Sequence, residues 1–300
     1  MIENLVSVII TTYGRDNKLI FDAINSVRNQ TYKNIEIIVV DDNGIGTEAQ
    51  KRNQDIFDKE DDINYIANKN NSGAQVSRNV GILASKGEYI ACLDDDDIWM
   101  PEKIEKQVAM IEKENLGLVF CNGYRFYNND LNQTKLYQYN FVSDRKLDFE
   151  TELRSDHIGS TSIPLMRKTC LAKTGLFDID MPARQDYEMW LRFCRYFDVK
   201  GIDEPLFYYR YHSGDRITKS YKKEILSYQL LWKKYLFKKY REDYNKNKVA
   251  KANIQFTFCR TYFKAKHLMI ASFYGLKACL SSPKTVLNTI RNYNKHKAQF

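Results

Sequence analysis

The first hundred residues alternate between short apolar runs and segments with helical spacing. Residues 5–12 and 35–40 are β-branched runs of strand length, and residues 88–93 form a third such run. Helical spacing and a further short strand separate these runs, with helices expected at 19–27, 47–57 and 74–85 and the strand at 63–67. Strands and helices that alternate in this way predict an α/β fold with a mostly parallel sheet covered by helices.

The remainder of the chain predicts a mixed α/β segment followed by helices. A helix is expected to start near Pro101, and a polar stretch from 128 to about 144 is typical of a loop. Apolar runs predict strands at 116–120, 160–166, 200–202 and 206–211, and a helix at 184–197. Beyond Ser220 the pattern is wholly helical, with one apolar helix face formed by Val249, Ala252, Phe256, Cys259 and Phe263. We therefore divide the chain into a first domain, residues 1–215 with halves 1–115 and 116–215, and a helical extension, 216–300.

Charge differs sharply between these two parts. The net charge of the chain is +8, but residues 216–300 carry 20 Lys and Arg against 3 Asp and Glu, a net +17. Residues 1–215 carry 26 against 35, a net −9. A basic extension suits an anionic membrane surface or an acidic partner, whereas the acidic larger part is unlike a nucleic-acid platform, so we expect no nucleic acid as partner.

Composition and the cysteines restrict the class of protein. With 43% hydrophobic residues over 300 positions, the chain is apolar and long enough to bury a core. Its six cysteines lie far apart without a CxxC pair, which favours neither a zinc site nor a disulfide framework and fits a reducing cytosol. We identify no signal peptide and no apolar run of the ~18 residues that a spanning helix needs. A cytoplasmic protein, soluble or peripheral on the inner face of the cell membrane, is expected.

Four consecutive aspartates, Asp94, Asp95, Asp96 and Asp97, follow the strand expected at 88–93 and are called the acidic segment below. Mutual repulsion of four adjacent carboxylates requires a cation or strong hydrogen bonds. Hard oxygen ligands suit Mn²⁺ or Mg²⁺, which bind one or two protein carboxylates and leave positions for phosphate oxygens. The competing interpretation is a solvated acidic turn that caps the helix after it.

A second pair of carboxylates, Asp41 and Asp42, ends the strand expected at 35–40. In a parallel sheet, ligands bind beyond the carboxyl ends of strands, where this pair and the acidic segment would share one edge. A carboxylate there can accept from a uracil N–H or from ribose hydroxyls, with Thr11, Tyr13 and Arg15 as the opposite wall and Tyr13 stacked on the base. A simple turn is the alternative for each of these positions.

Six ordered stretches resemble glycosyltransferase family 2 with the GT-A fold. They are VSVIITTYGR, IEIIVVDDNG, NNSGAQVSRNVGILASKGEYIACLDDDDIWMPEKIEKQ, IPLMRKTCLAKTGLFD, ARQDYEMWLRF and PLFYYRYHSG. The first three resemble the nucleotide-sugar-binding half of the family and the others its acceptor half, so the similarity covers about residues 5–215. One departure is Gln185, where the family usually has Glu before the Asp that is kept here as Asp186.

The resemblance implies roles for individual residues. Nucleotide binding is implied for Thr11, Tyr13, Asp42 (or Asp41 in its place), Arg78, Asp94 and Asp95, and metal binding for Asp96. Asp186 matches the family's general base, and it also begins a helix whose buried face would contain Trp190 and Phe193, which directs its carboxylate toward the crevice.

Two further residues each have two possible roles. His212 is either a contact to metal or diphosphate or a surface histidine in a turn. Trp99 either lines the acceptor site or seats the helix after it.

The expected function is transfer of a hexose, glucose or galactose, from a UDP-sugar to a lipid-linked (undecaprenyl-diphosphate) saccharide in O-antigen or capsule synthesis. The resemblance implies a single displacement with inversion and a β-linked product. Alternatives are a sugar-nucleotide-forming nucleotidyltransferase and a noncatalytic UDP-sugar-binding membrane scaffold. The motif WKKYLFKKYR in the extension alternates aromatic and basic side chains, which suits the headgroup region of an anionic membrane. A packing surface against the first domain is the alternative role of this extension.

Overall fold

The computed structural model describes residues 1–127, 130–137, 146–211 and 223–297. It divides the chain into two compact units. The sheet unit comprises Met1–Asp148, His157–Ile179 and Gln185–Ser213, and the helical unit comprises Phe149–Asp156, Asp180–Arg184 and Gly214–Phe300. The candidate site residues that fall in the described part all belong to the sheet unit, so that unit positions the chemistry.

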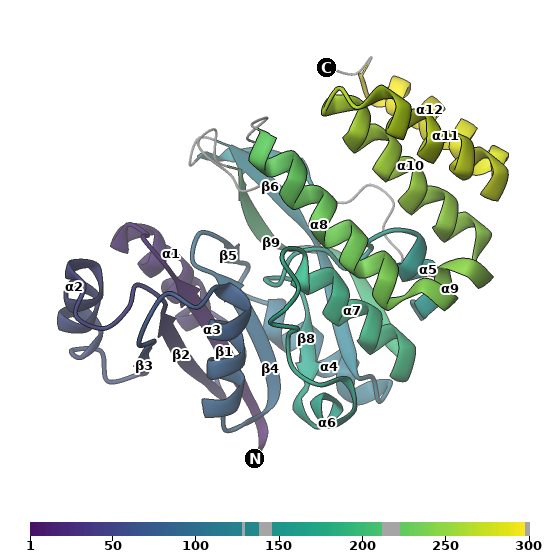
Figure 1. Ribbon diagram of the computed structural model, residues 1–300. Coiled ribbons are helices and arrows are strands. Elements are labelled where there is room, and N and C mark those ends of the chain that lie inside the picture. Colours follow the sequence, from purple (N-terminus) through teal and green to yellow (C-terminus); the bar gives the residue numbers. More distant parts are fainter. Residues whose placement is uncertain (128–129, 138–145, 212–222, 298–300) are drawn as a thin grey trace. The chain divides into compact units, whose positions relative to one another are not determined.

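The first half of the sheet unit is the expected parallel sheet covered by helices. Its strands lie in the order β3-β2-β1-β4, and all of these pairings are parallel. Their bounds are β1 Ile2–Thr12, β2 Ile35–Asp41, β3 Ile63–Ala67 and β4 Gly87–Asp94. The helices between them are α1 Asn17–Arg28, α2 Glu48–Phe57 and α3 Ala74–Ala84. The prediction for this half is confirmed, and Figure 1 shows β2, β1 and β4 side by side.

The second half of the sheet mixes both pairing directions. β8, Leu165–Arg167, pairs antiparallel with β4 and with β6, Leu118–Tyr127, while β6 runs parallel to β9, Val199–Tyr211. The two strands expected at 200–202 and 206–211 are therefore one strand, because register shifts in the β6–β9 ladder absorb the polar residues between them. Two short strands were not expected, β5 at Ile98–Trp99 and β7 at Asp130–Leu136.

Helices α4 (Lys103–Lys113), α6 (Leu171–Thr174) and α7 (Gln185–Tyr196), with a 3₁₀ turn at Lys168–Cys170, complete the sheet unit. The helix expected at Pro101 begins two residues later, at Lys103. The core lies between the sheet and its helices. Val8 and Ile10 of β1 are fully buried, and so is Ile9, which faces α3 at Gly81. A Cβ on Gly81 would lie 2.4 Å from Ile9 Cγ2, so only glycine permits this close approach of α3 to β1.

The register of the parallel strands brings the two carboxylate groups to one edge. β1 lies between β2 and β4, with Thr12 opposite Asp41 and Thr11 opposite Asp94. Asp42 and the acidic segment therefore flank the end of β1, as expected for a sheet in which three neighbouring strands end together.

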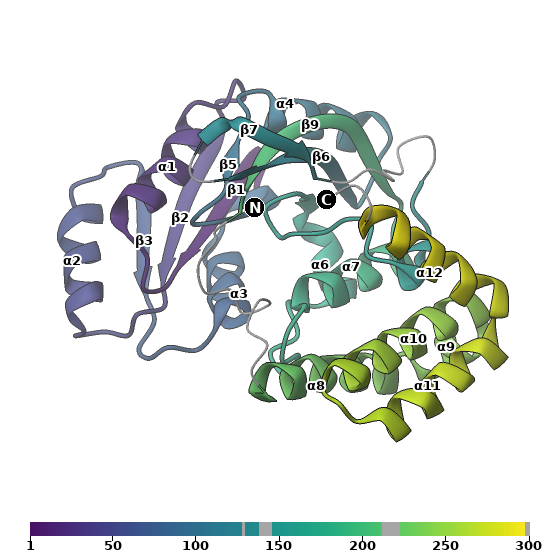
Figure 2. The same ribbon diagram turned by 90° about the horizontal axis from the view of Figure 1, so that it is seen from above.

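The helical unit contains α5 Phe149–Arg154, α8 Lys223–Lys239, α9 Arg241–Lys246, α10 Lys248–Lys264, α11 Leu268–Ser281 and α12 Pro283–Lys297. The expected helical extension is confirmed for the described residues. α10 packs against the other five helices, so its buried residues lie on several sides of the helix and not on the single apolar face that we predicted. Phe263, a member of that predicted face, is 65% exposed. α10 and α11 lie side by side in Figure 2. Across the described residues we find no helix of a length and apolarity that would cross a membrane.

Candidate active site

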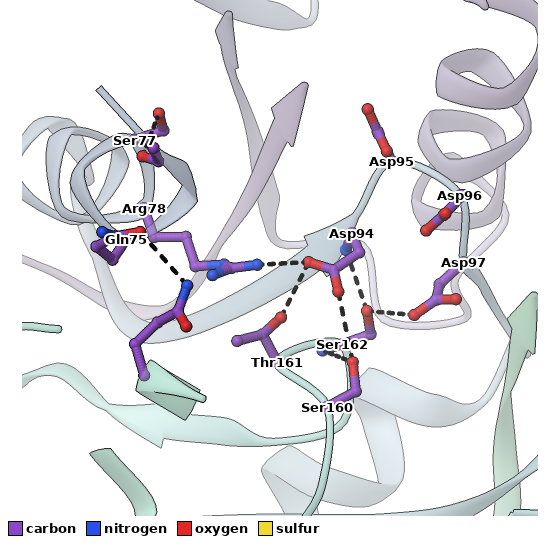
Figure 3. A network of polar contacts seen from close by, with 12 residues as sticks. Gln75, Ser77, Arg78, Asp94, Asp95, Asp96, Asp97, Ser160, Thr161 and Ser162 are labelled. Atoms are coloured by element: carbon purple, nitrogen blue, oxygen red, sulfur yellow. Dashed lines mark hydrogen bonds and ion pairs between the residues drawn. The ribbon is translucent and has the colours of Figure 1, made fainter. Parts of the chain in front are cut away.

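Asp94 is the centre of a polar network at the end of β4, which Figure 3 shows at close range. Its Oδ1 accepts hydrogen bonds from Arg78 Nη2 at 2.8 Å and Thr161 Oγ1 at 2.9 Å. Ser160 Oγ lies 3.5 Å from Oδ2, and the backbone N–H of Asp94 donates to Ser162 Oγ at 3.1 Å. The turn before β8 thus supplies three hydroxyl groups that fix the orientation of the first aspartate.

Arg78 reaches this network from α3. Its residue is 7% exposed, and the guanidinium lies 5.7 Å from the centroid of the Phe177 ring. Burial alone would lower the pKa of Arg78, but neighbouring negative groups, first of all Asp94 and also Asp186, raise it above its usual value. The site therefore contains a permanently charged, nearly enclosed cation that binds Asp94 and is influenced by the charge of Asp186.

Arg15 supplies the cation for the next two aspartates. Its Nε lies 2.9 Å from Asp95 Oδ1, and its Nη2 lies 3.0 Å from Asp96 Oδ2. Burial raises the pKa of Asp95 to about 6, although Arg15 acts to lower it. The Asp96 side chain is more accessible, with 20% of it exposed against 7% for Asp95. Of these two carboxylates, Asp96 is thus the one that a ligand reaches more easily.

Asp97 is held inside the protein. Ser162 Oγ donates to its Oδ2 at 2.7 Å, and the backbone N–H of Arg210 donates to its Oδ1 at 3.1 Å. Burial, followed by the charges of Asp96 and Asp94, raises the pKa of Asp97 well above its ordinary value. Arg210 also donates from Nε to the backbone oxygen of Asp96 at 2.8 Å. Asp97 and Arg210 therefore fix the backbone of the acidic segment.

Asp41 is enclosed by donors of the β2–α2–β3 region. Its Oδ1 accepts from the backbone and side-chain amides of Asn43, and its Oδ2 accepts from Asn53 Nδ2 and Tyr65 Oη, both at 2.8 Å. No part of Asp41 is exposed. This arrangement ties the turn after β2 to α2 and β3, which agrees with the turn role that was the alternative for this position.

Asp42 joins the end of β2 to the start of α3. Its Oδ1 accepts from Asn68 Nδ2 at 2.7 Å and from the backbone N–H of Ser72 at 2.9 Å. Its Oδ2 accepts from the backbone N–H of Gly73 at 2.8 Å, where the φ angle of +91° favours glycine. Asp42 thereby fixes the first turn of α3, the helix that carries Arg78.

Thr11 and Tyr13 lie at the end of β1, as expected for the opposite wall. Thr11 is half-buried between Val40 of β2 and Asp94 of β4. Tyr13 is 62% exposed, which leaves its ring available to stack on a planar group. The role of both residues in nucleotide binding stays a prediction.

Asp186 occupies the first turn of α7 and is half-buried. Its Oδ1 accepts from the backbone N–H of Tyr187 at 2.8 Å, and its charge acts on Arg78. The neighbouring Gln185 donates from Nε2 to Gln75 Oε1 of α3 at 3.4 Å. The start of α7 therefore contacts α3 through Gln185, and the charge of Asp186 acts on the cation that binds Asp94.

The buried face expected for α7 is present, because Trp190 and Phe193 are both fully buried. Trp190 Nε1 donates to the backbone oxygen of Gly159 at 2.8 Å. Since Gly159 precedes the turn whose hydroxyl groups orient Asp94, this bond fixes α7 relative to the acidic segment.

The side chain of Trp99 is buried and packs against its neighbours. It is 2% exposed, and its Nε1 donates to the backbone oxygen of Ser162 at 2.8 Å. The ammonium group of Lys103, in the first turn of α4, lies 4.0 Å from the centroid of the Trp99 ring. Trp99 thus packs against the helix that follows it, and its role in the acceptor site stays a prediction. His212 lies outside the described residues.

The donor set fits a divalent cation that shares its ligands with a substrate. In the described part of the chain, no three or more His, Cys, Asp or Glu side chains are grouped so that they could hold a metal ion. Asp96 offers carboxylate oxygens at an accessible edge, and Mg²⁺ or Mn²⁺ commonly takes one or two carboxylates and completes its shell with phosphate oxygens. The residues therefore fit a cation that arrives with a diphosphate.

Sequence reasoning missed the residues that orient these carboxylates. Ser160, Thr161 and Ser162 were assigned to a strand, whereas they form the turn that contacts Asp94 and Asp97. A run of three hydroxyl residues directly before an apolar strand was the available signal. Arg210, the lone charge in the apolar run expected at 206–211 and 5% exposed, was the other.

Two glycosyltransferases are similar in sequence to most of this chain. An uncharacterised glycosyltransferase of Methanocaldococcus jannaschii is 33% identical over 238 residues, which are 76% of this chain and 80% of that protein. The second, WfaP of Escherichia coli, is a UDP-Glc:α-D-GlcNAc-diphosphoundecaprenol β-1,3-glucosyltransferase; it is 32% identical over 74% of this chain and 83% of its own length.

The fold is that of GT-A glycosyltransferases. The crystal structure of S. aureus TarS 1–349 in complex with UDP-GlcNAc superposes with a TM-score of 0.66 over 91% of this chain and 79% of that one, at 17% identity. The sequence model of "Glycosyl transferase family 2" matches residues 7–175, which include the described aspartates from Asp41 to Asp97 and the turn that orients them. The chain is a glycosyltransferase and belongs to glycosyltransferase family 2.

Proposed function

We propose that the protein transfers a hexose from a UDP-sugar to a hydroxyl group of a saccharide carried on undecaprenyl diphosphate. The product would be a β-glycoside in O-antigen or capsule synthesis. WfaP, which is similar to 74% of this chain, is named for UDP-Glc as donor and a GlcNAc-diphosphoundecaprenol acceptor, and it supports glucose over galactose for this chain. The proposal would place the protein on the cytoplasmic side of the membrane, where it would reach an acceptor held by a lipid.

One observation carries the proposal: a buried cation, Arg78, binds the carboxylate that ends β4 and is within electrostatic range of the carboxylate in the first turn of α7. Asp94 binds Arg78 directly, and the charge of Asp186 acts on it. A glycosyl transfer needs positive charge near a leaving diphosphate and a base near the incoming hydroxyl group. Arg78 and Asp186 bring these two requirements to neighbouring positions in the sheet unit.

In the proposed mechanism, Asp42 holds the start of α3, and α3 presents Arg78 toward the diphosphate. Tyr13 stacks on the uracil ring. The Asp186 carboxylate takes the proton of the acceptor hydroxyl, and the hydroxyl oxygen forms its bond to the anomeric carbon as the bond to UDP breaks on the opposite face. This single displacement inverts the anomeric centre. Asp96 would hold Mn²⁺ or Mg²⁺ together with the donor phosphates, and the cation would neutralise charge on the leaving UDP.

The position of Asp186 supports its role as base. The residue lies in the first turn of α7, where the positive end of the helix dipole stabilises a carboxylate anion. It is half-buried, which leaves part of the carboxylate accessible to a hydroxyl group. Gln185, which departs from the family pattern, bonds to Gln75 and thereby links α7 to α3.

A donor screen tests the proposal. The full chain would be incubated with UDP-glucose, UDP-galactose or UDP-GlcNAc, a short-chain polyprenyl-diphosphate-GlcNAc acceptor, and Mn²⁺ or Mg²⁺. We expect UDP release that depends on the acceptor, with a disaccharide product from UDP-glucose whose β-linkage NMR identifies. Matched reactions with chelator measure the need for metal.

Two other results would contradict it. UDP binding without any transfer would indicate the noncatalytic scaffold. Release of pyrophosphate from UTP and a sugar phosphate would indicate the nucleotidyltransferase.

A further inference from the structure

The outer face of α11 carries the large apolar side chains of that helix. Met269 is 88% exposed, Phe273 52%, Leu276 62% and Leu280 77%. Steps of four, three and four residues place these side chains on one face of the helix, and we call them the apolar stripe. Four large apolar residues in one exposed row form a contiguous patch, which a protein that contacts only water rarely has.

The opposite face of α11 packs on α10 through the ring of Tyr274 and through small residues. Ala271 and Ala278 are buried, and a Cβ on Gly275 would lie 3.2 Å from Cys259 Sγ of α10. Packing within the helical unit therefore uses Tyr274 and the small side chains of α11, while the four residues of the apolar stripe stay exposed. The buried contacts of α11 thus involve its other face and not the apolar stripe.

Further exposed apolar residues lie at the start of α11 and on the adjacent helices α10 and α12. Leu287 and Ile290 of α12, which packs against α11, are 55% and 41% exposed. Leu268 at the start of α11 is 58% exposed, and Phe263 at the end of α10 is 65% exposed. Exposed large apolar side chains are therefore found on three helices of the part of the helical unit that the structure describes.

The charge around the apolar stripe identifies what covers it. Residues 248–300 contain ten Lys and Arg and no Asp or Glu. A second copy of this chain would bring an equally basic surface against it, whereas anionic phospholipid headgroups would neutralise it. α11 has 14 residues and so is about 21 Å long, short of the ~30 Å hydrocarbon core of a bilayer. Its length suits a helix that lies in the interface instead of crossing it.

We infer that the apolar stripe inserts into the headgroup–acyl boundary of an anionic bilayer, with the surrounding lysines and arginines bound to lipid phosphates. This inference does not rest on the proposed function, because it concerns a lipid surface and not the sugar acceptor. It differs from attraction by basic charge alone, since it requires the apolar side chains themselves.

Flotation of the full chain with lipid vesicles tests the inference. One set of vesicles contains phosphatidylglycerol and phosphatidylcholine, and the other phosphatidylcholine alone. The stripe variant combines Phe273→Ser, Leu276→Gln and Leu280→Gln. The matched control makes three equally polar changes at exposed apolar positions of the sheet unit, Leu83→Gln, Leu131→Gln and Ile179→Gln.

We expect the wild type and the control to bind the anionic vesicles alike, and the stripe variant to bind them about tenfold or more weakly. Vesicles without acceptor are used, so a failure of glycosyl transfer leaves this result intact. Equal binding by the stripe variant would overturn the inference in favour of charge alone. A wild-type dimer that the stripe variant dissociates, without vesicle binding, would assign the stripe to a second copy.

A substitution that keeps an apolar side chain provides a second measurement, which does not depend on how well the stripe variant folds. In Phe273→Trp the new indole should be quenched by lipids with brominated acyl chains, relative to the wild type under the same conditions. An indole that such vesicles leave unquenched would contradict insertion of the stripe.

Discussion

Lys103 offers a direct test of the energetics around the acidic segment. The residue lies at the start of α4 and is fully buried. Its ammonium group donates to Gln107 Oε1 at 2.8 Å and lies 4.0 Å from the centroid of the Trp99 ring. In the described part of the chain no carboxylate pairs with it. We predict that Lys103→Met makes the protein more stable at neutral pH.

The pKa of Lys103 gives the magnitude. Burial lowers this pKa from 10.5 to about 8. At about 1.4 kcal/mol per pKa unit, the charged form is disfavoured by about 3 kcal/mol at neutral pH. Methionine removes this cost, but it also loses a hydrogen bond of about 1 kcal/mol and a cation–π contact of about 1 kcal/mol. The variant should therefore gain about 1–2 kcal/mol in free energy of unfolding at pH 7.

The gain should vanish as the pH rises. Because the pKa of Lys103 is lower in the folded protein, the unfolded chain binds more protons between pH 8 and 10.5, and wild-type stability rises with pH across that window. From pH 7 to 9.5 the wild type should recover about 2 kcal/mol relative to Lys103→Met. Equilibrium urea unfolding of both proteins at the two pH values measures this difference.

Lys113→Met is the matched control, since Lys113 belongs to the same helix and is exposed. Its stability difference from the wild type should stay near zero at both pH values. A Lys103→Met variant that is less stable than the wild type at pH 7, or whose difference does not change with pH, would refute the reasoning. Such a result would mean that the buried ammonium group is stabilised by its surroundings.

Three further predictions concern the sheet unit. Asp186→Asn should keep its UDP affinity, measured by calorimetry, but lose transfer by about 10²-fold or more. Asp96→Asn should weaken metal-dependent UDP binding and transfer together. Normal transfer by a folded Asp186→Asn variant would exclude Asp186 as the base. Gly81→Ala should destabilise the protein by about 1–3 kcal/mol in urea, because its Cβ would lie 2.4 Å from Ile9 Cγ2, and an unchanged midpoint would contradict this packing. A chelator should leave the thermal midpoint of the donor-free protein unchanged within about 1 °C, and a clear drop would show a bound structural metal.

The sequence predicts the first half of the fold well because its elements are long and periodic. β3 was expected at 63–67 and occupies Ile63–Ala67, and α2 begins directly after Thr47, whose side chain caps it. Prediction failed where pairing alone creates an element. β5 has two residues, too few to show a period, and it exists because β9 pairs with it. The strand expected at 160–166 is present, but it is limited to the three residues of β8, which pair with β4 and β6.

In the candidate site too, the position of the carboxylates could be predicted from the sequence, whereas their contacts with distant segments could not. The end of an apolar strand followed by carboxylates predicts the shared edge, and the pairing of Thr11 with Asp94 confirms the geometry. Which carboxylates are accessible was not predictable, because it depends on partners from distant segments. Asp41 is enclosed by donors up to 24 positions along the chain, and Arg15 reaches Asp96 across 81 positions.

The acidic segment shows how these distant partners change the physical argument for a metal. From the sequence, the mutual repulsion of four adjacent carboxylates requires either a cation or strong hydrogen bonds, and a divalent metal is the natural partner. In the structure Arg78 binds Asp94, and Arg15 binds both Asp95 and Asp96. Burial raises the pKa of Asp97, which favours the neutral form of its carboxyl group. The protein's own residues therefore balance the segment, which is the reason to expect no effect of chelator on the donor-free fold. A requirement for metal would then arise from the charge of the donor diphosphate, and it should appear only in measurements made with UDP present.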